Sequence, residues 1–211
     1  MRIFEIFESV QGETSRSGLP MLFIRTSACN LRCTWCDTTH AYHGGVEHSV
    51  AELVERAEQS GLRHVTLTGG EPLLQPDAPE LLRLLLDRDF DVQIETNGSI
   101  SIKGLDPRVR RIVDMKPPAS GEAHRFLASN LDELTQNDEL KFVLFDRSDY
   151  EWARDRVRRL SLESRCPVLF SPAWDQLAPA DLVAWILEDR LPVRLNLQLH
   201  KIIWGPHVQG V

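Results

Sequence analysis

The chain has 211 residues, of which 42% are hydrophobic and 26% charged, the composition of an ordinary globular protein with one domain, residues 1–211. Its 24 basic and 31 acidic residues give a net charge of -7, so no general attraction to nucleic acid is expected. No stretch approaches the ~18 consecutive apolar residues of a membrane span, and the acidic Glu5 interrupts any signal peptide. We therefore expect a cytoplasmic protein that has no membrane partner.

Strand-like and helix-like segments alternate along the chain. Ser49 with Glu52, and Asp77 with Glu80, have the spacing of helix capping boxes, and Gly61 marks the end of the first helix. The predicted strands are residues 3–7, 21–26, 64–68, 92–95, 112–115, 140–144, 168–171 and 193–199. The predicted helices are residues 49–61, 77–88, 149–160 and 179–190.

This alternation predicts an α/β protein made of parallel βα units. Right-handed crossovers curl such units into an open or partial barrel. A complete eightfold barrel usually takes ~250 residues, so the sequence predicts an incomplete (β/α) barrel with fewer helices.

Residues 27–48 form a connection too long for an ordinary βα loop, and they hold three of the four cysteines. The spacing is Cys29-x-x-x-Cys33-x-x-Cys36, with Trp35 before the last cysteine. Four interpretations are open: a zinc site completed by a histidine such as His40, a redox pair, free structural thiols, or a [4Fe–4S] cluster held by three thiolates.

The fourth cysteine and two glycine-containing turns need separate interpretations. Cys166 stands in an apolar run and is expected to be a small buried side chain. The segment Thr68-Gly69-Gly70-Glu71-Pro72 follows a predicted strand, where glycines let a ligand approach the backbone. Glu95-Thr96-Asn97-Gly98 ends the next strand, either as polar groups at a ligand-binding rim or as a plain turn.

Several of these motifs resemble a known family. The cysteine spacing and the Gly-Gly-Glu-Pro segment are similar to those of the radical S-adenosylmethionine enzymes. Glu5 to Glu13, Arg25, Cys36-Asp37-Thr38 and Gln198-Leu199-His200-Lys201 resemble the 7-carboxy-7-deazaguanine synthases over nearly the whole chain. The resemblance implies an incomplete barrel of the radical S-adenosylmethionine type, with a [4Fe–4S] cluster, S-adenosylmethionine and Mg²⁺ as cofactors.

The reaction that this resemblance implies is a radical ring contraction. 6-Carboxy-5,6,7,8-tetrahydropterin is converted to 7-carboxy-7-deazaguanine with loss of ammonia, a lyase step toward queuosine. The reactive group is an adenosyl radical derived from the cofactor, so no side chain is expected to be the primary catalyst.

The resemblance also implies roles for individual residues. The expected cluster ligands are Cys29, Cys33 and Cys36, and Thr38 is the expected Mg²⁺ ligand. The expected substrate contacts are Val10, Gln11, Gly12, Glu13, Arg25, Thr68 and His200. The expected contacts with S-adenosylmethionine are Trp35, Cys36, Asp37, Gly70, Glu71, Asp114, Met115, Lys116, Ser171, Pro172, Ala173 and Trp174.

Two of these assignments have plain structural alternatives. Arg25 is suited to binding a carboxylate, or it pairs with a surface acid. His200 contacts the substrate, or it is a hydrogen-bonded core histidine.

The expected partners are the pterin substrate, a flavodoxin or ferredoxin as electron donor, and a second copy of the chain. Arg154, Arg156, Arg158 and Arg159 form either a docking patch for the donor or a solvated helix face. Two other functions compete: an activase that installs a glycyl radical on a partner protein, and a zinc-binding adaptor without enzymatic activity.

Overall fold

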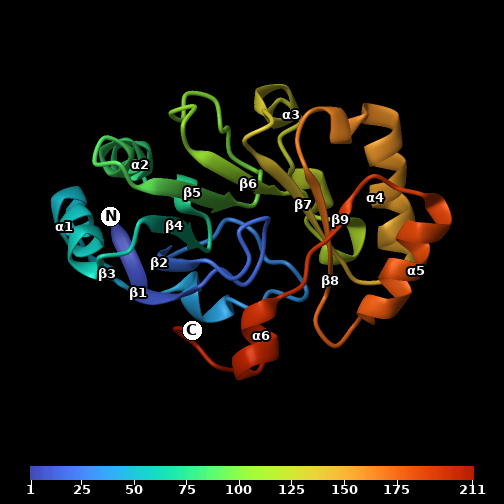
Figure 1. The fold of residues 1–211 in the computed structure, drawn as a ribbon, viewed down its shortest axis with the longest axis horizontal. Coiled ribbons are helices and arrows are strands. Elements are labelled where there is room, and N and C mark those ends of the chain that lie inside the picture. Colours follow the sequence, from blue (N-terminus) through green and yellow to red (C-terminus); the bar gives the residue numbers. More distant parts are fainter.

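The computed structural model describes residues 1–211 and is built around one nine-stranded sheet (Figure 1). The strand order is β3-β1-β2-β4-β5-β6-β7-β8-β9. Strand β1 pairs antiparallel with β2 and β3, and every pairing from β2 through β9 is parallel. Because β3 and β9 lie at opposite edges, the sheet does not close, and the predicted incomplete α/β barrel is confirmed.

The structure gives the bounds of each element. The strands are β1 (Arg2–Val10), β2 (Pro20–Thr26), β3 (Val46–Glu47), β4 (His64–Gly69), β5 (Asp91–Thr96), β6 (Arg110–Asp114), β7 (Glu139–Leu144), β8 (Val168–Pro172) and β9 (Arg194–Leu195). The helices are α1 (Val50–Ser60), α2 (Ala78–Leu86), α3 (Asn130–Glu133), α4 (Arg147–Leu160), α5 (Pro179–Asp189) and α6 (Leu199–Trp204). No helix combines the length and the apolar composition that crossing a membrane requires.

One of the two predicted helix caps is present. The Ser49 hydroxyl accepts from the Glu52 amide at 3.2 Å, the Glu52 carboxylate accepts from the Ser49 amide at 2.7 Å, and Gly61 ends α1 in the left-handed region. The predicted box at Asp77 is wrong, because its side chain makes no capping bond to α2 and lies 3.7 Å from the N-terminal ammonium group.

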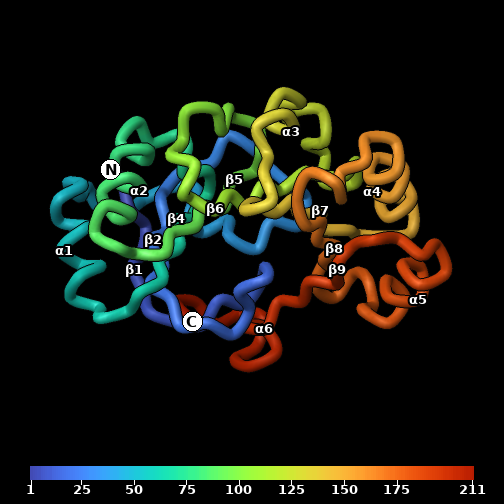
Figure 2. The backbone as a smooth tube through the Cα atoms, turned by 45° about the horizontal axis from the view of Figure 1, so that its top comes forward, coloured from blue at the N-terminus to red at the C-terminus, as the bar shows by residue number.

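The predicted last strand, residues 193–199, is also wrong in its second half. Only Arg194–Leu195 pair with β8, and the chain leaves the sheet at Asn196, whose side chain accepts from the Thr14 amide and donates to the Ser171 hydroxyl. The Leu199 amide then donates to the Gly12 carbonyl at 2.8 Å, and the apolar residues that follow form α6. Figure 2 shows this red segment beside the blue N-terminal part of the chain.

The two faces of the sheet differ in character because the strands alternate between apolar and polar residues. The apolar residues point outward and form the main core with the helices, for example Leu67, Ile94 and Phe142 with Leu81 and Val157. Helices α1 to α5 surround the sheet in Figure 1, whereas α6 lies apart from them at the lower edge. Cys166 is buried in the core, as the sequence predicts.

The residues between these core positions point inward. They include Thr68, Glu95, Asp114 and Lys141, all of which line one cavity. The fold thus places a polar surface on the inner side of the sheet, and this surface forms a wall of the site.

Candidate active site

A single large cavity of about 670 Å³ opens at the carboxyl ends of the parallel strands. Most of the residues that the sequence predicts for the site line it: Val10, Gln11, Gly12, Glu13, Arg25, Cys29, Cys33, Trp35, Cys36, Asp37, Thr38, Thr68, Gly70, Asp114, Lys116, Ala173, Trp174 and His200. These residues come from segments far apart in the chain, and the fold brings them together around one cavity.

Four predicted residues lie behind the cavity wall: Glu71, Met115, Ser171 and Pro172. Strand geometry explains one of them, since Asp114 and Lys116 face the cavity and the intervening Met115 therefore packs into the core. The structure does not support direct side-chain contact between these four residues and a cofactor.

The cysteine loop is held in place by contacts with a distant part of the chain. The Thr34 hydroxyl donates to the Ala119 carbonyl at 2.8 Å, and the Arg32 amide donates to the Glu122 carboxylate at 2.7 Å. Trp35 stacks on Phe145 with ring centroids 5.2 Å apart. The loop is therefore a fixed element of the cavity wall.

The three thiols on this loop suit an iron–sulfur cluster. Cys29, Cys33 and Cys36 are unpaired, half-buried and exposed to the same cavity. Burial, with smaller contributions from Asp114 and the neighbouring thiols, raises the pKa of Cys33 to about 11, although Lys116 opposes the shift. Bound iron favours the thiolate form against this effect, and three soft sulfur donors match the ligands that such clusters use.

A site for one metal ion is a different arrangement. No three His, Cys, Asp or Glu side chains lie close enough together to hold a single ion. The structure therefore offers no preformed zinc site at the cysteines and His40.

The Gly-Gly segment packs directly against the cysteine loop. A Cβ atom on Gly70 would lie 2.1 Å from the Ala28 carbonyl oxygen and 2.8 Å from the Cys29 Cβ, so only glycine fits there. The Glu71 amide donates to the same Ala28 carbonyl at 2.9 Å. This contact fixes the position of Cys29 relative to the end of β4.

The Glu71 carboxylate has a structural role. It is fully buried and accepts from the amides of Leu73 and Asn97, at 3.0 and 2.7 Å, and from the Thr96 hydroxyl. In turn, the Asn97 side chain lies 3.7 Å from the Cys29 sulfur. Glu71 thus organises the turn after β5, which reaches the cysteine loop.

The floor of the cavity is the connection between β1 and β2. The Thr14 amide donates to Asn196 at 2.7 Å, Ser15 bonds to Glu139, and Arg16 pairs with Asp91 at 2.6 Å. Glu139 and Asp91 are the first residues of β7 and β5, at the amino ends of the strands. The connection therefore crosses beneath the barrel and presents residues 11–13 to the cavity.

Glu13 on this floor is an ionised carboxylate with both oxygens occupied. Its oxygens accept from Lys141 Nζ at 2.8 Å and from Gln198 Nε2 at 2.9 Å. Burial alone would raise the pKa of Glu13, but Lys141 and the hydrogen bonds outweigh it and lower the pKa. Burial alone would lower the pKa of Lys141, but Glu13, Asp114 and Glu95 hold it well above its usual value.

The α6 segment covers one side of the cavity, from the floor at Gly12 to the cysteine loop at Asp37. Lys201 Nζ lies 2.7 Å from the Asp37 carboxylate, and Gln198 bridges Asp37 and Glu13. Burial would raise the pKa of Asp37, but Lys201 brings it below the usual range. A Cβ atom on Gly12 would lie 1.9 Å from His200 Nδ1, so the glycine is required where the helix meets the floor.

Arg25 pairs with an acid, which is one of the two interpretations given for it. Its Nε donates to Glu5 at 2.7 Å, whereas its terminal nitrogens make no hydrogen bond within the chain. Both side chains line the cavity and are about one-fifth exposed. Glu5 thus orients the guanidinium group. Its two terminal nitrogens have no acceptor within the chain and are suited to binding a carboxylate.

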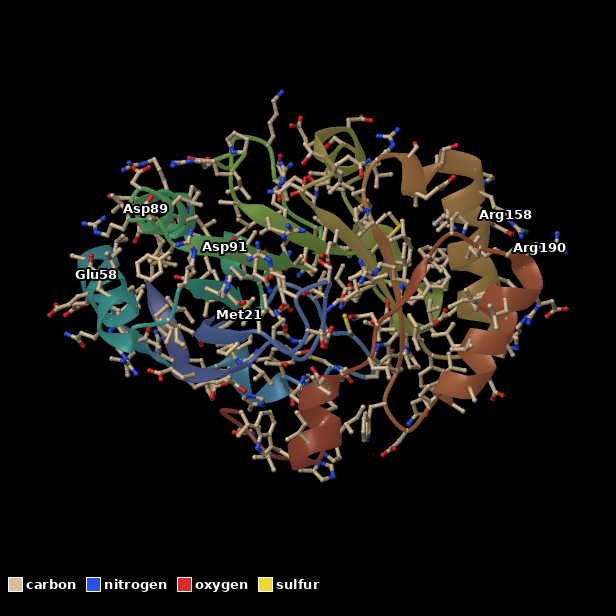
Figure 3. All side chains as sticks on the ribbon, in the orientation of Figure 1. Met21, Glu58, Asp89, Asp91, Arg158 and Arg190 are labelled. Carbon is tan, nitrogen blue, oxygen red and sulfur yellow. The ribbon has the colours of Figure 1, made fainter.

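The arginine-rich helix α4 lies outside the site. Arg154 and Arg158 pair with Asp189 at 3.3 and 3.0 Å, and Arg156 lies over the Trp152 ring at 3.5 Å. In Figure 3, Arg158 lies at the outer edge of the molecule, whereas Met21 lies in the central sheet. These contacts favour a structural helix face over a docking patch.

Several cavity residues were missed by the sequence analysis. Lys141 contributes a buried charge, and residues 206–211 at the C-terminus form part of the wall. Glu95, which the sequence already places at a possible ligand-binding rim, also lines the cavity. Lys141 could have been noticed, because a lysine between Leu140 and Phe142 in a predicted buried strand needs a partner. The tail carries no such signal.

Comparison with known proteins gives consistent results. Residues 23–116 match the model of the radical SAM superfamily. A 7-carboxy-7-deazaguanine synthase from Koribacter versatilis is 44% identical, with both chains fully covered, and one from Chlorobaculum tepidum is 40% identical, covering 100% of this chain and 97% of the relative. The crystal structure of QueE from Escherichia coli superposes with a TM-score of 0.76 at 24% identity, covering 93% of each chain.

Proposed function

Since the chain belongs to the 7-carboxy-7-deazaguanine synthase family of radical S-adenosylmethionine enzymes, we propose that the cavity lined by the three cysteines is its active site. The enzyme is a lyase that converts 6-carboxy-5,6,7,8-tetrahydropterin to 7-carboxy-7-deazaguanine and ammonia in queuosine biosynthesis. The observation that carries the assignment of the site is that the cysteine loop, the floor at Gln11–Glu13 and the α6 segment all meet in one cavity.

The cofactors are a [4Fe–4S] cluster and S-adenosylmethionine, which supply one-electron radical chemistry when bound. We assign the cluster to Cys29, Cys33 and Cys36, which leaves one iron without a protein ligand. Gly69 and Gly70 line the cavity beside Cys29, and we place the cofactor's polar end there. Trp35, Asp37, Asp114, Lys116, Ala173 and Trp174 complete the wall on which we place the adenosyl part.

The substrate is assigned to the floor. The pterin's pyrimidine edge carries N–H donors, which match the ionised Glu13 and the neighbouring Gln11. We propose that the guanidinium group of Arg25 binds the substrate carboxylate, and Thr68 lies opposite Arg25 on the neighbouring strand β4. We assign Mg²⁺ to the Thr38 hydroxyl, a hard oxygen donor at the cavity wall.

The closed geometry of the site supports a small-molecule substrate over the polypeptide of an activase. Gln198 binds Glu13 and Lys201 binds Asp37, so the α6 segment covers one side of the cavity and narrows access to it. A peptide would require this cover to open. The family membership likewise argues against a zinc adaptor.

For the electron donor we propose a small acidic flavoprotein or ferredoxin. The cysteine loop is half-exposed, which allows electron entry from the surface. We also propose that the reaction takes place in the cytoplasm, where thiols remain reduced.

We further propose that the enzyme is a homodimer. Large apolar side chains remain exposed along the last elements: Leu187 is 70% exposed, Ile202 58% and Ile203 51%. Strand β9 also leaves a free sheet edge. Light scattering should give twice the chain mass, and Leu187→Glu should shift the enzyme toward the monomer; a wild-type monomer at micromolar concentration contradicts the proposal.

The decisive experiment is anaerobic reconstitution followed by turnover. The protein should bind about four iron and four sulfide per chain and, once reduced, convert carboxytetrahydropterin to a product with deazapurine absorbance. A protein with an intact cluster that forms no deazapurine but transfers a radical to a partner protein would support an activase. A colourless protein with one zinc would support the adaptor.

A further inference from the structure

A side-chain amide in the turn after β5 lies against the cysteine loop. Asn97 Nδ2 is 3.7 Å from the Cys29 sulfur and donates to Asn30 Oδ1 at 3.1 Å. Asn97 lines the cavity, yet it is only 7% exposed. Both N–H groups of this side chain therefore act on the start of the cysteine loop, and water has little access to compete with them.

The orientation of this amide is fixed by its neighbours. Asn97 Oδ1 accepts from the Ser99 amide at 2.9 Å, so Nδ2 is the atom that faces the sulfur. The Asn97 backbone amide donates to the buried Glu71 carboxylate at 2.7 Å. Asn30, which accepts from Asn97, is itself held by a 2.8 Å bond from its Nδ2 to the Ser99 hydroxyl. The fold itself thus holds the donor toward Cys29.

The Cys29 sulfur accepts a second hydrogen bond, from the Leu31 amide at 3.5 Å. Any residue at position 31 other than proline would supply that backbone group. Asn97, in contrast, supplies its bond through a side chain, from a position 68 residues away in the sequence. Its effect on the sulfur therefore depends on the residue type, and substitution can test it.

The charge on this sulfur connects the contact to electron transfer. A thiolate that binds an iron–sulfur cluster carries part of the negative charge, and reduction by one electron increases that charge. An N–H dipole aimed at the sulfur stabilises the reduced form more than the oxidised form, because the attraction grows with the charge. Hydrogen bonds to the sulfurs are accordingly among the features that set cluster potentials. The burial of Asn97 strengthens the effect, since little water screens it.

We propose that Asn97 is a positioning residue that donates a hydrogen bond to the Cys29 thiolate and thereby raises the reduction potential of the cluster held there. The step it assists transfers one electron from the external donor protein to the cluster. No covalent bond forms or breaks in that step, and Asn97 keeps both of its amide protons. This inference rests on the proposed function and extends it to the control of electron entry.

The test is a redox titration of the reconstituted protein, followed by the electron paramagnetic resonance signal of the reduced cluster. Asn97→Ala removes the donor. At a fixed potential the ratio of reduced to oxidised cluster should fall about tenfold, a shift of about 59 mV to more negative potential for a one-electron couple. Asn97→Asp keeps the size of the side chain and an acceptor for the Ser99 amide, but at pH 8 it places an anionic oxygen beside the sulfur. Its potential should fall at least as far.

Ser99→Ala is the matched control. It removes the hydroxyl that holds Asn30 but keeps the backbone amide that orients Asn97, so its potential should stay close to that of the wild type. Turnover gives a second readout. With reduced methyl viologen, Asn97→Ala should lose activity by about the same factor as its reduced fraction, and with Ti(III) citrate, a stronger reductant, it should return to within about twofold of the wild type.

Four results would overturn the inference. They are a potential of Asn97→Ala no lower than that of Ser99→Ala, a potential of Asn97→Asp at or above the wild-type value, a loss of turnover that persists with Ti(III) citrate, and a loss of cluster binding in both Asn97 variants. A failure of the proposed function is distinguishable, because the wild type itself would then bind no [4Fe–4S] cluster or form no deazapurine, whereas the titration needs no substrate.

Discussion

Replacing Gly12 with alanine should disturb the cover of the cavity through a single methyl group. The new Cβ would lie 1.9 Å from Nδ1 of His200, whereas ordinary van der Waals contact begins at 3.4 Å. The imidazole ring must therefore retreat by about 1.5 Å to restore contact distance. Because His200 lies in the first turn of α6, the retreat moves the start of this helix.

The cost of this displacement follows from the contacts at the junction. An extra methyl group in a packed site costs about 1–3 kcal/mol, and weakening the 2.8 Å bond from the Leu199 amide to the Gly12 carbonyl adds about 0.5–1.5 kcal/mol. Helix α6 has only six residues near the C-terminus, so it can detach while the barrel stays folded. A cost of about 2 kcal/mol corresponds to a roughly 30-fold larger open fraction of α6.

Hydrogen exchange of the peptide that contains α6 measures this opening directly. We expect exchange in residues 199–204 to accelerate in Gly12→Ala while the melting temperature changes little, and the pterin to bind more weakly. Removing the ring in the double variant Gly12→Ala/His200→Ala should restore slow exchange. Unchanged exchange in Gly12→Ala, or no recovery in the double variant, would refute the steric argument.

Three further predictions concern the floor and the cysteine loop. Lys141→Met leaves Glu13 without its cation and should destabilise the fold by about 3–5 kcal/mol. In the wild type the lowered pKa of Glu13 means that this carboxylate stabilises the fold above its ordinary pKa of 4.5 and less so in acid. In the variant, burial raises the pKa of Glu13, so denaturation at several pH values should show that the variant becomes less stable as the pH rises. Cys33→Ala should abolish cluster binding and cleavage of S-adenosylmethionine with little change in melting temperature, because the thiol is half-buried on a loop; cofactor cleavage by the variant contradicts the ligand assignment. Thr38→Ala should raise the Mg²⁺ concentration needed for half-maximal turnover, and an unchanged titration removes Thr38 from the metal site.

Local motifs made much of this molecule predictable from its sequence. The cysteine spacing, the capping box at Ser49 and the Gly-Gly turn each depend on residues close together in the chain, and the structure contains all three features. Helix α6 was missed because residues 193–204 are rich in apolar residues and have no capping signal, so their pattern suits a strand equally well. Its conformation depends on the Gly12 carbonyl, almost the whole chain away.

The larger omission was the polar inner face of the sheet, although the sequence carries its signal. Strands of a parallel sheet that are buried on both faces read as continuous apolar runs. In contrast, β4 reads His-Val-Thr-Leu-Thr, β5 reads Asp-Val-Gln-Ile-Glu and β7 reads Glu-Leu-Lys-Phe-Val. Every second residue is polar in β4 and β5, as are the first two such positions of β7, and in a buried parallel sheet this pattern indicates an interior built to hold a polar ligand.

The partners on that inner face could not be read from the strands themselves. Lys141 and Glu13 are 128 positions apart, and they meet only because the β1–β2 connection passes beneath the barrel. A cation and a carboxylate buried separately would each be strongly disfavoured, so the fold is favoured only when this connection occupies the floor. Lys141 forms its ion pair with Glu13, whereas burial raises the pKa of Glu95, which has no ion pair. Position in the fold, more than residue type, thus distinguishes the two carboxylates.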